Sequence, residues 1–96
     1  MPSLNSQQVG RRLKSVPDWS KRGRTIRRRF EFPGFLPAID FVNRVARKAE
    51  KSDHHPDIDI RWRTLHFALS THSAGGLTAL DLDLAAQIDA LAASAP

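Results

Sequence analysis

The sequence contains no cysteine and no apolar run long enough to cross a membrane. A chain without cysteine cannot form disulfides, cannot use a thiolate as a nucleophile and cannot bind zinc or an iron–sulfur cluster through sulfur. No apolar segment approaches the ~20 residues that a membrane-spanning helix needs. The polar stretch from Met1 to Gln8 also lacks the hydrophobic region of a signal peptide. These absences favour a cytoplasmic protein with no membrane partner.

The length and composition predict one small domain over residues 1–96, in which residues 1–5 form a flexible leader. Hydrophobic residues make up 41% of the chain, which is enough for a modest core. A domain of this size has little stability to spare. Oligomerisation would therefore be a natural way to bury more apolar surface.

Positive charge is concentrated at the N-terminal end of the chain. Residues 1–29 carry nine Lys and Arg and one acid, Asp18, whereas residues 30–96 carry six Lys and Arg and nine acids. The two parts have net charges of +8 and −3, and the whole chain has +5. A basic segment of this kind can attract an anionic partner, or it can be a solvated face.

The first third of the chain predicts a short helix over residues 6–16, with Ser6 as its cap, followed by a hairpin. The helical spacing comes from Val9, Leu13 and Val16. Strands are expected over residues 18–23 and 25–32, joined by a turn. The apolar face of the second strand comprises Ile26, Phe30 and Phe32. Arg28 falls on this apolar face, so we expect it to lie near the end of the sheet or to be shielded by a partner.

A long helix is predicted from Leu36 to Lys51, because Pro33 and Gly34 break the preceding strand. Its broad apolar stripe comprises Phe35, Ala38, Ile39, Val42, Val45, Ala46 and Ala49. Phe41 falls off this stripe, which suggests a second contact such as a subunit interface. Glu50 lies at the edge of the stripe, where we expect it to be partly shielded from water.

The second half of the chain predicts two more strands, over residues 57–63 and 64–71, and a last helix over residues 79–93. Thr78 fits the N-cap of that helix, and Asp81 follows three residues later in a variant capping box. The residues expected to face inward are Leu84, Ala85, Ile88, Leu91 and Ala92. This order predicts an α+β fold, a four-stranded antiparallel sheet with three helices on one face.

Three of the four histidines fall into two polar clusters. The first is the segment 50–56, in which His54 and His55 follow a glutamate by one helical turn and precede a proline that should stop the helix. The second is the segment 70–72, which ends on His72. Imidazole is the side chain best suited to moving protons near neutral pH. We expect the two clusters to meet in the fold and to form one acid/base site.

The spacing of these motifs resembles the pterin-4a-carbinolamine dehydratase family. The resemblance is carried by Glu50-x-x-x-His54-His55-Pro56, Ser70-Thr71-His72 and Gly76-Leu77-Thr78-x-x-Asp81. Trp19 and the aromatic pattern over residues 30–41 also fit. The similarity extends from about Val9 to Leu91. Each motif alone is a weak signal, whereas the three together at these distances are a strong one.

The resemblance implies a hydro-lyase, a 4a-hydroxytetrahydrobiopterin dehydratase. Such an enzyme converts 4a-hydroxytetrahydropterin to quinonoid dihydropterin, and so recycles the cofactor of aromatic amino acid hydroxylases. Loss of water from C4a needs a proton delivered to the departing hydroxyl and a proton removed from a ring nitrogen, and a histidine can perform either step. The resemblance also implies homodimers or homotetramers, and the chemistry requires no metal and no cofactor.

The resemblance assigns acid and base roles to three histidines as a cluster: His54, His55 and His72. Which of them protonates the hydroxyl stays open. Glu50 and Asp81 would each orient an imidazole or stabilise its charged form, although Asp81 also fits a purely structural role in the helix cap. The residues expected to contact the substrate are Trp19, Pro56, Ser70 and Thr71. For Trp19, core packing is an equal alternative.

Other interpretations of the same residues stay open. Three histidines can bind zinc, although adjacent ligands such as His54 and His55 point in different directions. The arginines over residues 27–29 predict at most weak, non-specific and salt-sensitive binding to nucleic acid. His66 is expected to be structural or at the surface. A non-catalytic binding or regulatory module on the same fold is the alternative function, but it would not need the three histidines.

Overall fold

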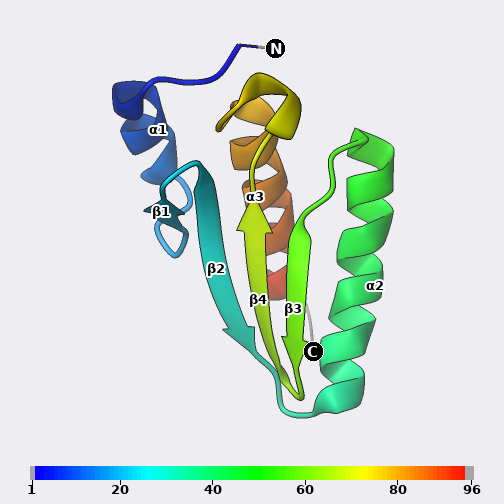
Figure 1. Ribbon diagram of the computed structural model, residues 1–96. Coiled ribbons are helices and arrows are strands. Elements are labelled where there is room, and N and C mark those ends of the chain that lie inside the picture. Colours follow the sequence, from blue (N-terminus) through cyan, green and yellow to red (C-terminus); the bar gives the residue numbers. More distant parts are fainter. Residues whose placement is uncertain (1, 95–96) are drawn as a thin grey trace.

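The computed structural model describes residues 2–94 and has the element order α-β-β-α-β-β-α. Its elements are α1 (Ser6–Leu13), β1 (Ser20–Arg22), β2 (Thr25–Glu31), α2 (Phe35–Ser52), β3 (Asp57–Arg61), β4 (Thr64–Leu69), the short 3-10 helix η1 (His72–Ala74) and α3 (Ala79–Ala93). Figure 1 shows the helices packed against one sheet. The predicted α+β fold is confirmed. No helix in the described part of the chain is both long and apolar enough to cross a membrane.

The four strands form one antiparallel sheet in the order β1-β2-β4-β3. In the register of β2 and β4, Ile26 pairs with Leu69 and Phe30 pairs with Leu65. All four side chains are buried, because they lie on the face that the helices cover. The alternate residues of these strands point to the opposite face, which no helix of the described chain covers (Figure 1).

Helix α3 has the bounds that its sequence predicts. Thr78 caps the helix, and its side chain accepts a hydrogen bond from the amide of Leu80. The carboxylate of Asp81 accepts a hydrogen bond from the amide of Thr78, which completes the capping box. Leu84 and Ile88 are fully buried against the sheet. The capping residues therefore specify the start of the helix, but the apolar spacing identifies its buried face only in part: Leu82, which was not expected to face inward, is buried, whereas Leu91 and Ala92 are half-buried.

Helix α2 buries three residues of the expected stripe, Ala38, Val45 and Ala49, together with one residue outside it, Phe41. Phe41 is only 2% exposed and lies at the centre of an aromatic cluster, with its ring centroid 5.2 Å from Phe30, 5.0 Å from Phe32 and 6.0 Å from Phe67. The expectation that Phe41 falls outside the core was therefore wrong. The buried residues of α2 are Ala38, Phe41, Val45 and Ala49.

Some residues at the edges of the expected stripe of α2 are exposed, although they were expected to be buried. Phe35 is 49% exposed, and Ala46 is also exposed. The Glu50 side chain is 77% exposed, so the expected shielding from water is also wrong. Apolar residues form a broad surface on this helix, and the sequence alone does not say which part of so broad a surface meets the sheet.

Several boundaries differ from the sequence prediction for local reasons. Helix α1 begins at Ser6 as predicted, but its cap is Asn5, which forms a capping box with Gln8, and the helix ends at Leu13 and not at residue 16. Strand β3 ends before Trp62, which has a φ of 55° in the two-residue turn to β4. The amide of Leu4 donates to the carbonyl of Leu77 at 2.7 Å, so this end of the expected flexible leader is attached to the domain.

Candidate active site

The antiparallel pairing of β3 and β4 places the two histidine segments at one end of the sheet. Asp57, the first residue of β3, pairs with Ala68 near the end of β4. The chain that precedes β3 therefore lies beside the chain that follows β4. Residues 54–56 and 70–72 occupy these two positions, at the upper end of the sheet in Figure 1. Helix α2 ends just before them at Asp53, whose left-handed φ of 48° turns the chain toward β3.

A short hydrogen bond joins His54 to helix α3. The Nε2 atom of His54 lies 2.6 Å from Oδ1 of Asp81. His54 is 8% exposed and Asp81 is fully buried, so water does not compete for this contact. The capping box fixes the backbone position of Asp81 in the first turn of α3. The carboxylate therefore has the structural role in the cap and also orients the imidazole.

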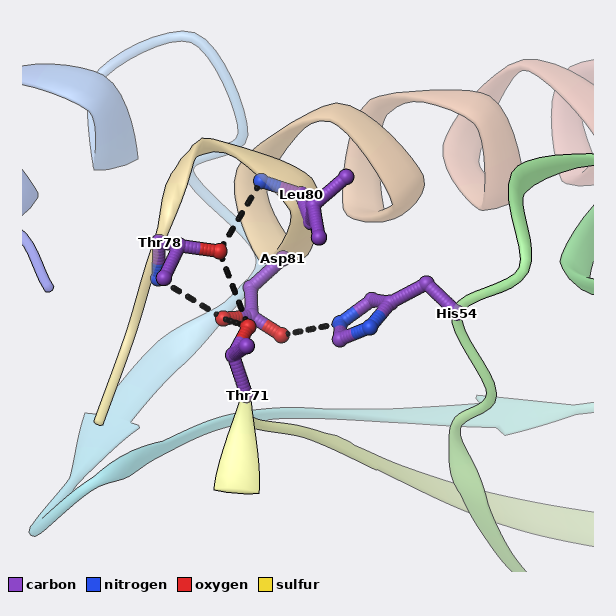
Figure 2. Close-up of polar contacts among 5 residues, drawn as sticks. All are labelled: His54, Thr71, Thr78, Leu80 and Asp81. Carbon is purple, nitrogen blue, oxygen red and sulfur yellow. Dashed lines mark hydrogen bonds and ion pairs between the residues drawn. The ribbon is translucent and has the colours of Figure 1, made fainter. Parts of the chain in front are cut away.

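The second oxygen of Asp81 binds the other histidine segment. Oδ2 accepts hydrogen bonds from the Thr71 hydroxyl at 2.8 Å and from the Thr78 amide at 2.9 Å. The hydroxyls of Thr71 and Thr78 are themselves 2.8 Å apart. Figure 2 shows His54, Thr71 and Thr78 converging on this one carboxylate. Since Thr71 directly precedes His72, Asp81 connects both segments that the sequence analysis singled out.

His55 makes a similar contact in a different environment. Its Nε2 atom lies 2.6 Å from Oε1 of Glu50, but the two side chains are 56% and 77% exposed. Exposed pairs of this kind contribute little free energy, because water can replace either partner. The contact pairs Glu50 with one of the three histidines and leaves His55 accessible from solvent.

His72 is the first residue of η1, and its side chain is exposed. The loop that carries it is closed by the pairing of Thr71 with Gly76 and by Gly75, whose φ of 71° favours glycine. His72 is therefore held next to Thr71 by a defined loop. Ser70 is half-buried on the strand side of this loop, and Pro56 is half-buried at the start of β3. The structure thus leaves two of the three histidines accessible and buries the third.

Trp19 lies elsewhere. It is only 3% exposed, and its Nε1 atom donates a hydrogen bond of 2.7 Å to Oδ1 of Asp89. Asp89 follows Asp81 by eight residues on α3, which corresponds to roughly 12 Å along the helix axis. This contact supports the core-packing alternative for Trp19.

The predicted capping box correctly pairs Thr78 with Asp81, but sequence reasoning missed the contacts of the Thr71 hydroxyl with Asp81 and Thr78, and assigned Thr71 to substrate contact. The Thr71–Asp81 contact depends on how the loop over residues 72–77 folds back. Within residues 2–94, no three or more His, Asp or Glu side chains are grouped so that they could hold a metal ion.

Comparisons with known proteins agree with this geometry. A family model described as pterin 4 alpha carbinolamine dehydratase matches residues 2–91. A Nocardia farcinica protein provisionally named pterin-4-alpha-carbinolamine dehydratase is 55% identical over 93% of this chain and 94% of the relative. A Mycolicibacterium smegmatis protein with the same provisional name is 51% identical over 93% of this chain and 95% of the relative.

Two solved structures have the same architecture. The crystal structure of a transcriptional coactivator/pterin dehydratase from Brucella melitensis superposes with a TM-score of 0.90 at 33% identity, and covers 94% of this chain and 98% of the other. A pterin dehydratase-like protein identified as a RuBisCO assembly factor in the alpha-carboxysome superposes with a TM-score of 0.68 at 25% identity, over 80% of this chain and 92% of the other.

Proposed function

The chain belongs to the pterin-4-alpha-carbinolamine dehydratase family, and from that premise we propose that it is a dehydratase of 4a-hydroxytetrahydropterins. The products are quinonoid dihydropterin and water, so the enzyme would recycle the tetrahydropterin cofactor in the cytoplasm. One observation carries the proposal. Asp81 binds His54 with one oxygen and the segment of His72 with the other. This buried carboxylate stabilises the start of α3 and also orients an imidazole, as a site for proton transfer needs.

The proposed reaction consists of two proton transfers and one bond cleavage. A proton passes to the C4a hydroxyl, the C–O bond breaks, and the bonding electrons leave with water. The lone pair of the adjacent ring nitrogen forms a double bond to C4a, and the proton of that nitrogen passes to a base. Atoms and charge balance without an oxidant, a reductant or a metal. Such proton transfers by positioned side chains typically contribute about 10²–10⁴-fold each to a rate.

The side chains fit these roles by their exposure and contacts. His55 and His72 are exposed and can meet a substrate that arrives from solvent. His54 is oriented by its hydrogen bond to the buried Asp81. Glu50 contacts His55 in the same way at the surface. In the proposal the three histidines share acid and base work, and the substrate's polar edge lies against Pro56, Ser70 and Thr71.

The direct test uses chemically generated 4a-hydroxytetrahydropterin, whose decay to the quinonoid product is followed by absorbance. The proposal predicts faster decay with protein than without it. A matched control is the double variant His55→Ala/His72→Ala at the same concentration, which keeps the buried network but lacks the exposed imidazoles. Equal decay rates with and without wild-type protein would remove the dehydratase proposal.

A second candidate is a binding module, alone or alongside the enzyme. Four exposed large apolar residues gather at the end of the molecule away from the histidines: Phe35, Leu36, Ile60 and Trp62. The amide of Phe32 donates to the carbonyl of Arg63 at 2.9 Å, which holds the start of α2 beside the β3–β4 turn. Relatives named as a coactivator and an assembly factor favour a protein partner for this surface. A homodimer or homotetramer would also bury it.

Turnover and association separate the two candidates. Leu36→Ser/Trp62→Ser should weaken self-association or partner binding, as measured by light scattering, and should leave the histidine site intact. If this variant keeps its assembly state, the apolar end is not the interface. If wild-type protein assembles but shows no turnover, the binding module becomes the better account.

A further inference from the structure

We propose that Thr71 and Thr78 are positioning residues that hold the Asp81 carboxylate in place, so that it keeps the proton of His54 on Nε2 and leaves Nδ1 as the nitrogen that exchanges protons with the substrate. The catalytic part of this inference rests on the proposed dehydratase function. The tautomer itself is a property of the free protein and can be measured without substrate.

The hydroxyl protons of the two threonines can be assigned by elimination. Thr71 has a single hydroxyl proton, which it donates to Oδ2 of Asp81. In the 2.8 Å contact between the two hydroxyls, the proton must therefore come from Thr78. The Thr78 oxygen in turn accepts the amide proton of Leu80 at 3.2 Å. The hydrogen bonds from Leu80 through the two threonines thus all run toward the carboxylate (Figure 2).

The direction of these hydrogen bonds determines which oxygen of Asp81 is left to accept a hydrogen bond from His54. Its Oδ2 atom already accepts two donors, the Thr71 hydroxyl and the Thr78 amide. A carboxylate only accepts hydrogen bonds, so the remaining oxygen, Oδ1, requires a proton on Nε2 of His54. A neutral imidazole carries one N–H, and therefore Nδ1 keeps the free lone pair. Because His54 and Asp81 are both buried, water cannot replace either of them as the hydrogen-bond partner of the other.

The exposed pair of His55 and Glu50 lacks this constraint. The Glu50 side chain makes no second hydrogen bond within the described residues, and it is 77% exposed. Its carboxylate can rotate, and water can take its place. In contrast, His54 is held by a carboxylate whose orientation is itself determined by two further residues. The exposed pair therefore serves as an internal comparison for the test.

Replacing Asp81 with asparagine should invert the tautomer. In Asp81→Asn the carboxamide oxygen must keep facing the Thr78 amide and the Thr71 hydroxyl, because both are donors. The NH₂ group then faces Nε2 of His54, which must become an acceptor, and the proton moves to Nδ1. We expect the imidazole nitrogen chemical shifts of His54 to exchange in NMR spectra of nitrogen-labelled protein. Turnover should fall on the order of 10⁴-fold, as for an Asp-to-Asn change behind a catalytic histidine in a serine protease.

A second pair of variants keeps the test decisive if Asp81→Asn does not fold. Thr71→Val preserves the shape of the side chain but removes the hydroxyl, so Asp81 loses one of its orienting donors. Oδ2 keeps the Thr78 amide as a donor, so we expect Nε2 of His54 to stay protonated but its hydrogen bond to Oδ1 to weaken, seen as an upfield shift of the Nε2 proton, and turnover to fall by about 10–100-fold. Thr71→Ser restores the hydroxyl and should restore both the hydrogen bond and the rate.

The controls separate the tautomer from general damage. Glu50→Gln should leave the His54 shifts unchanged, because the Glu50 side chain contacts His55 and not His54. Asp83→Asn, an exposed change on the same helix, should leave turnover unchanged. A wild-type His54 with its proton on Nδ1, or an Asp81→Asn protein with unaltered His54 shifts, would overturn the inference. If wild-type protein shows no turnover, the dehydratase proposal fails, while the shifts still decide the tautomer.

Discussion

Arg28 and Asp89 form an ion pair of 2.6 Å between β2 and α3. The guanidinium carbon of Arg28 also lies 4.1 Å from the ring centroid of Phe30. The same oxygen of Asp89 accepts the indole proton of Trp19. These contacts show how an arginine fits on an apolar strand face. The sequence left two alternatives for Arg28, a position near the end of the sheet or shielding by a partner, and Asp89 is that partner.

Removing the carboxylate should destabilise the fold. Asp89→Ala leaves the buried indole of Trp19 without its acceptor, and leaves Arg28 with only its longer contact of 3.5 Å to the exposed Asp18. We expect the free energy of unfolding to fall by about 1–3 kcal/mol, the cost of unsatisfied partly buried donors. Urea denaturation measures this change. The control is Asp83→Ala, which breaks an exposed ion pair with Arg12 and should cost less than about 1 kcal/mol. Equal decreases in the two variants would contradict this account.

The parts of the fold that the sequence specifies well are those where two independent signals agree. Helix α3 has both a capping box and a run of apolar residues, and its bounds follow from them, whereas its buried face follows only in part because apolar residues lie on most sides of the helix. Strand β4 alternates strictly and β2 alternates except at Arg28, and this alternation identifies their faces. Helix α2 has no side-chain cap and a broad apolar surface, so its length can be predicted but its rotation cannot. The aromatic partners on the sheet decide that rotation, and they are distant in sequence.

The rotation of α2 about its axis predicts that substitutions of Phe41 and Leu36 change the stability of the protein by very different amounts. Phe41→Ala removes a ring that contacts three other aromatic side chains, and we expect the free energy of unfolding to fall by about 3–5 kcal/mol. Leu36→Ala changes a side chain that is 72% exposed, and should change stability by no more than about 0.5 kcal/mol in the monomer. Both values come from denaturation curves at low protein concentration. A small effect at Phe41 would show that α2 is rotated differently.

The candidate site can be predicted from the sequence only in outline. The motif spacing indicates which histidine segments meet, and the antiparallel pairing of β3 with β4 explains why they share one end of the sheet. The sequence does not show that His54 is buried while His55 is exposed, because both follow the same helix end. That difference comes from the left-handed turn at Asp53 and from the position of Asp81 on α3.

The histidine variants should separate catalysis from folding. His55→Ala and His72→Ala remove exposed side chains, so we expect turnover to fall by about 10²–10⁴-fold with little change in the unfolding curve. His54→Ala should reduce turnover and also stability, because it leaves a buried Asp81 oxygen without its partner. His66→Ala, an exposed change on the open sheet face, is the control and should keep the wild-type rate. Wild-type rates in both His55→Ala and His72→Ala would exclude a three-histidine site.

The last prediction concerns the arginines of β2, which differ in their surroundings. Arg27 is exposed and so is Arg29, whereas Arg28 is bound to Asp89. We expect Arg27→Gln/Arg29→Gln to weaken binding to a labelled DNA duplex. The dependence of log affinity on log salt should become shallower by roughly one unit for each phosphate that the variant no longer neutralises, as measured by fluorescence anisotropy between about 50 and 200 mM salt.

Turnover should stay near the wild-type value in that variant, because neither arginine adjoins the histidine segments. The matched control is Arg47→Gln/Lys48→Gln, which removes the same charge from the exposed side of α2. If the control weakens DNA binding equally, the effect reflects net charge and not a patch on the sheet. A strong fall in turnover in Arg27→Gln/Arg29→Gln would instead place these side chains at the substrate site or at a subunit interface, because no described contact links them to the three histidines of the proposed site.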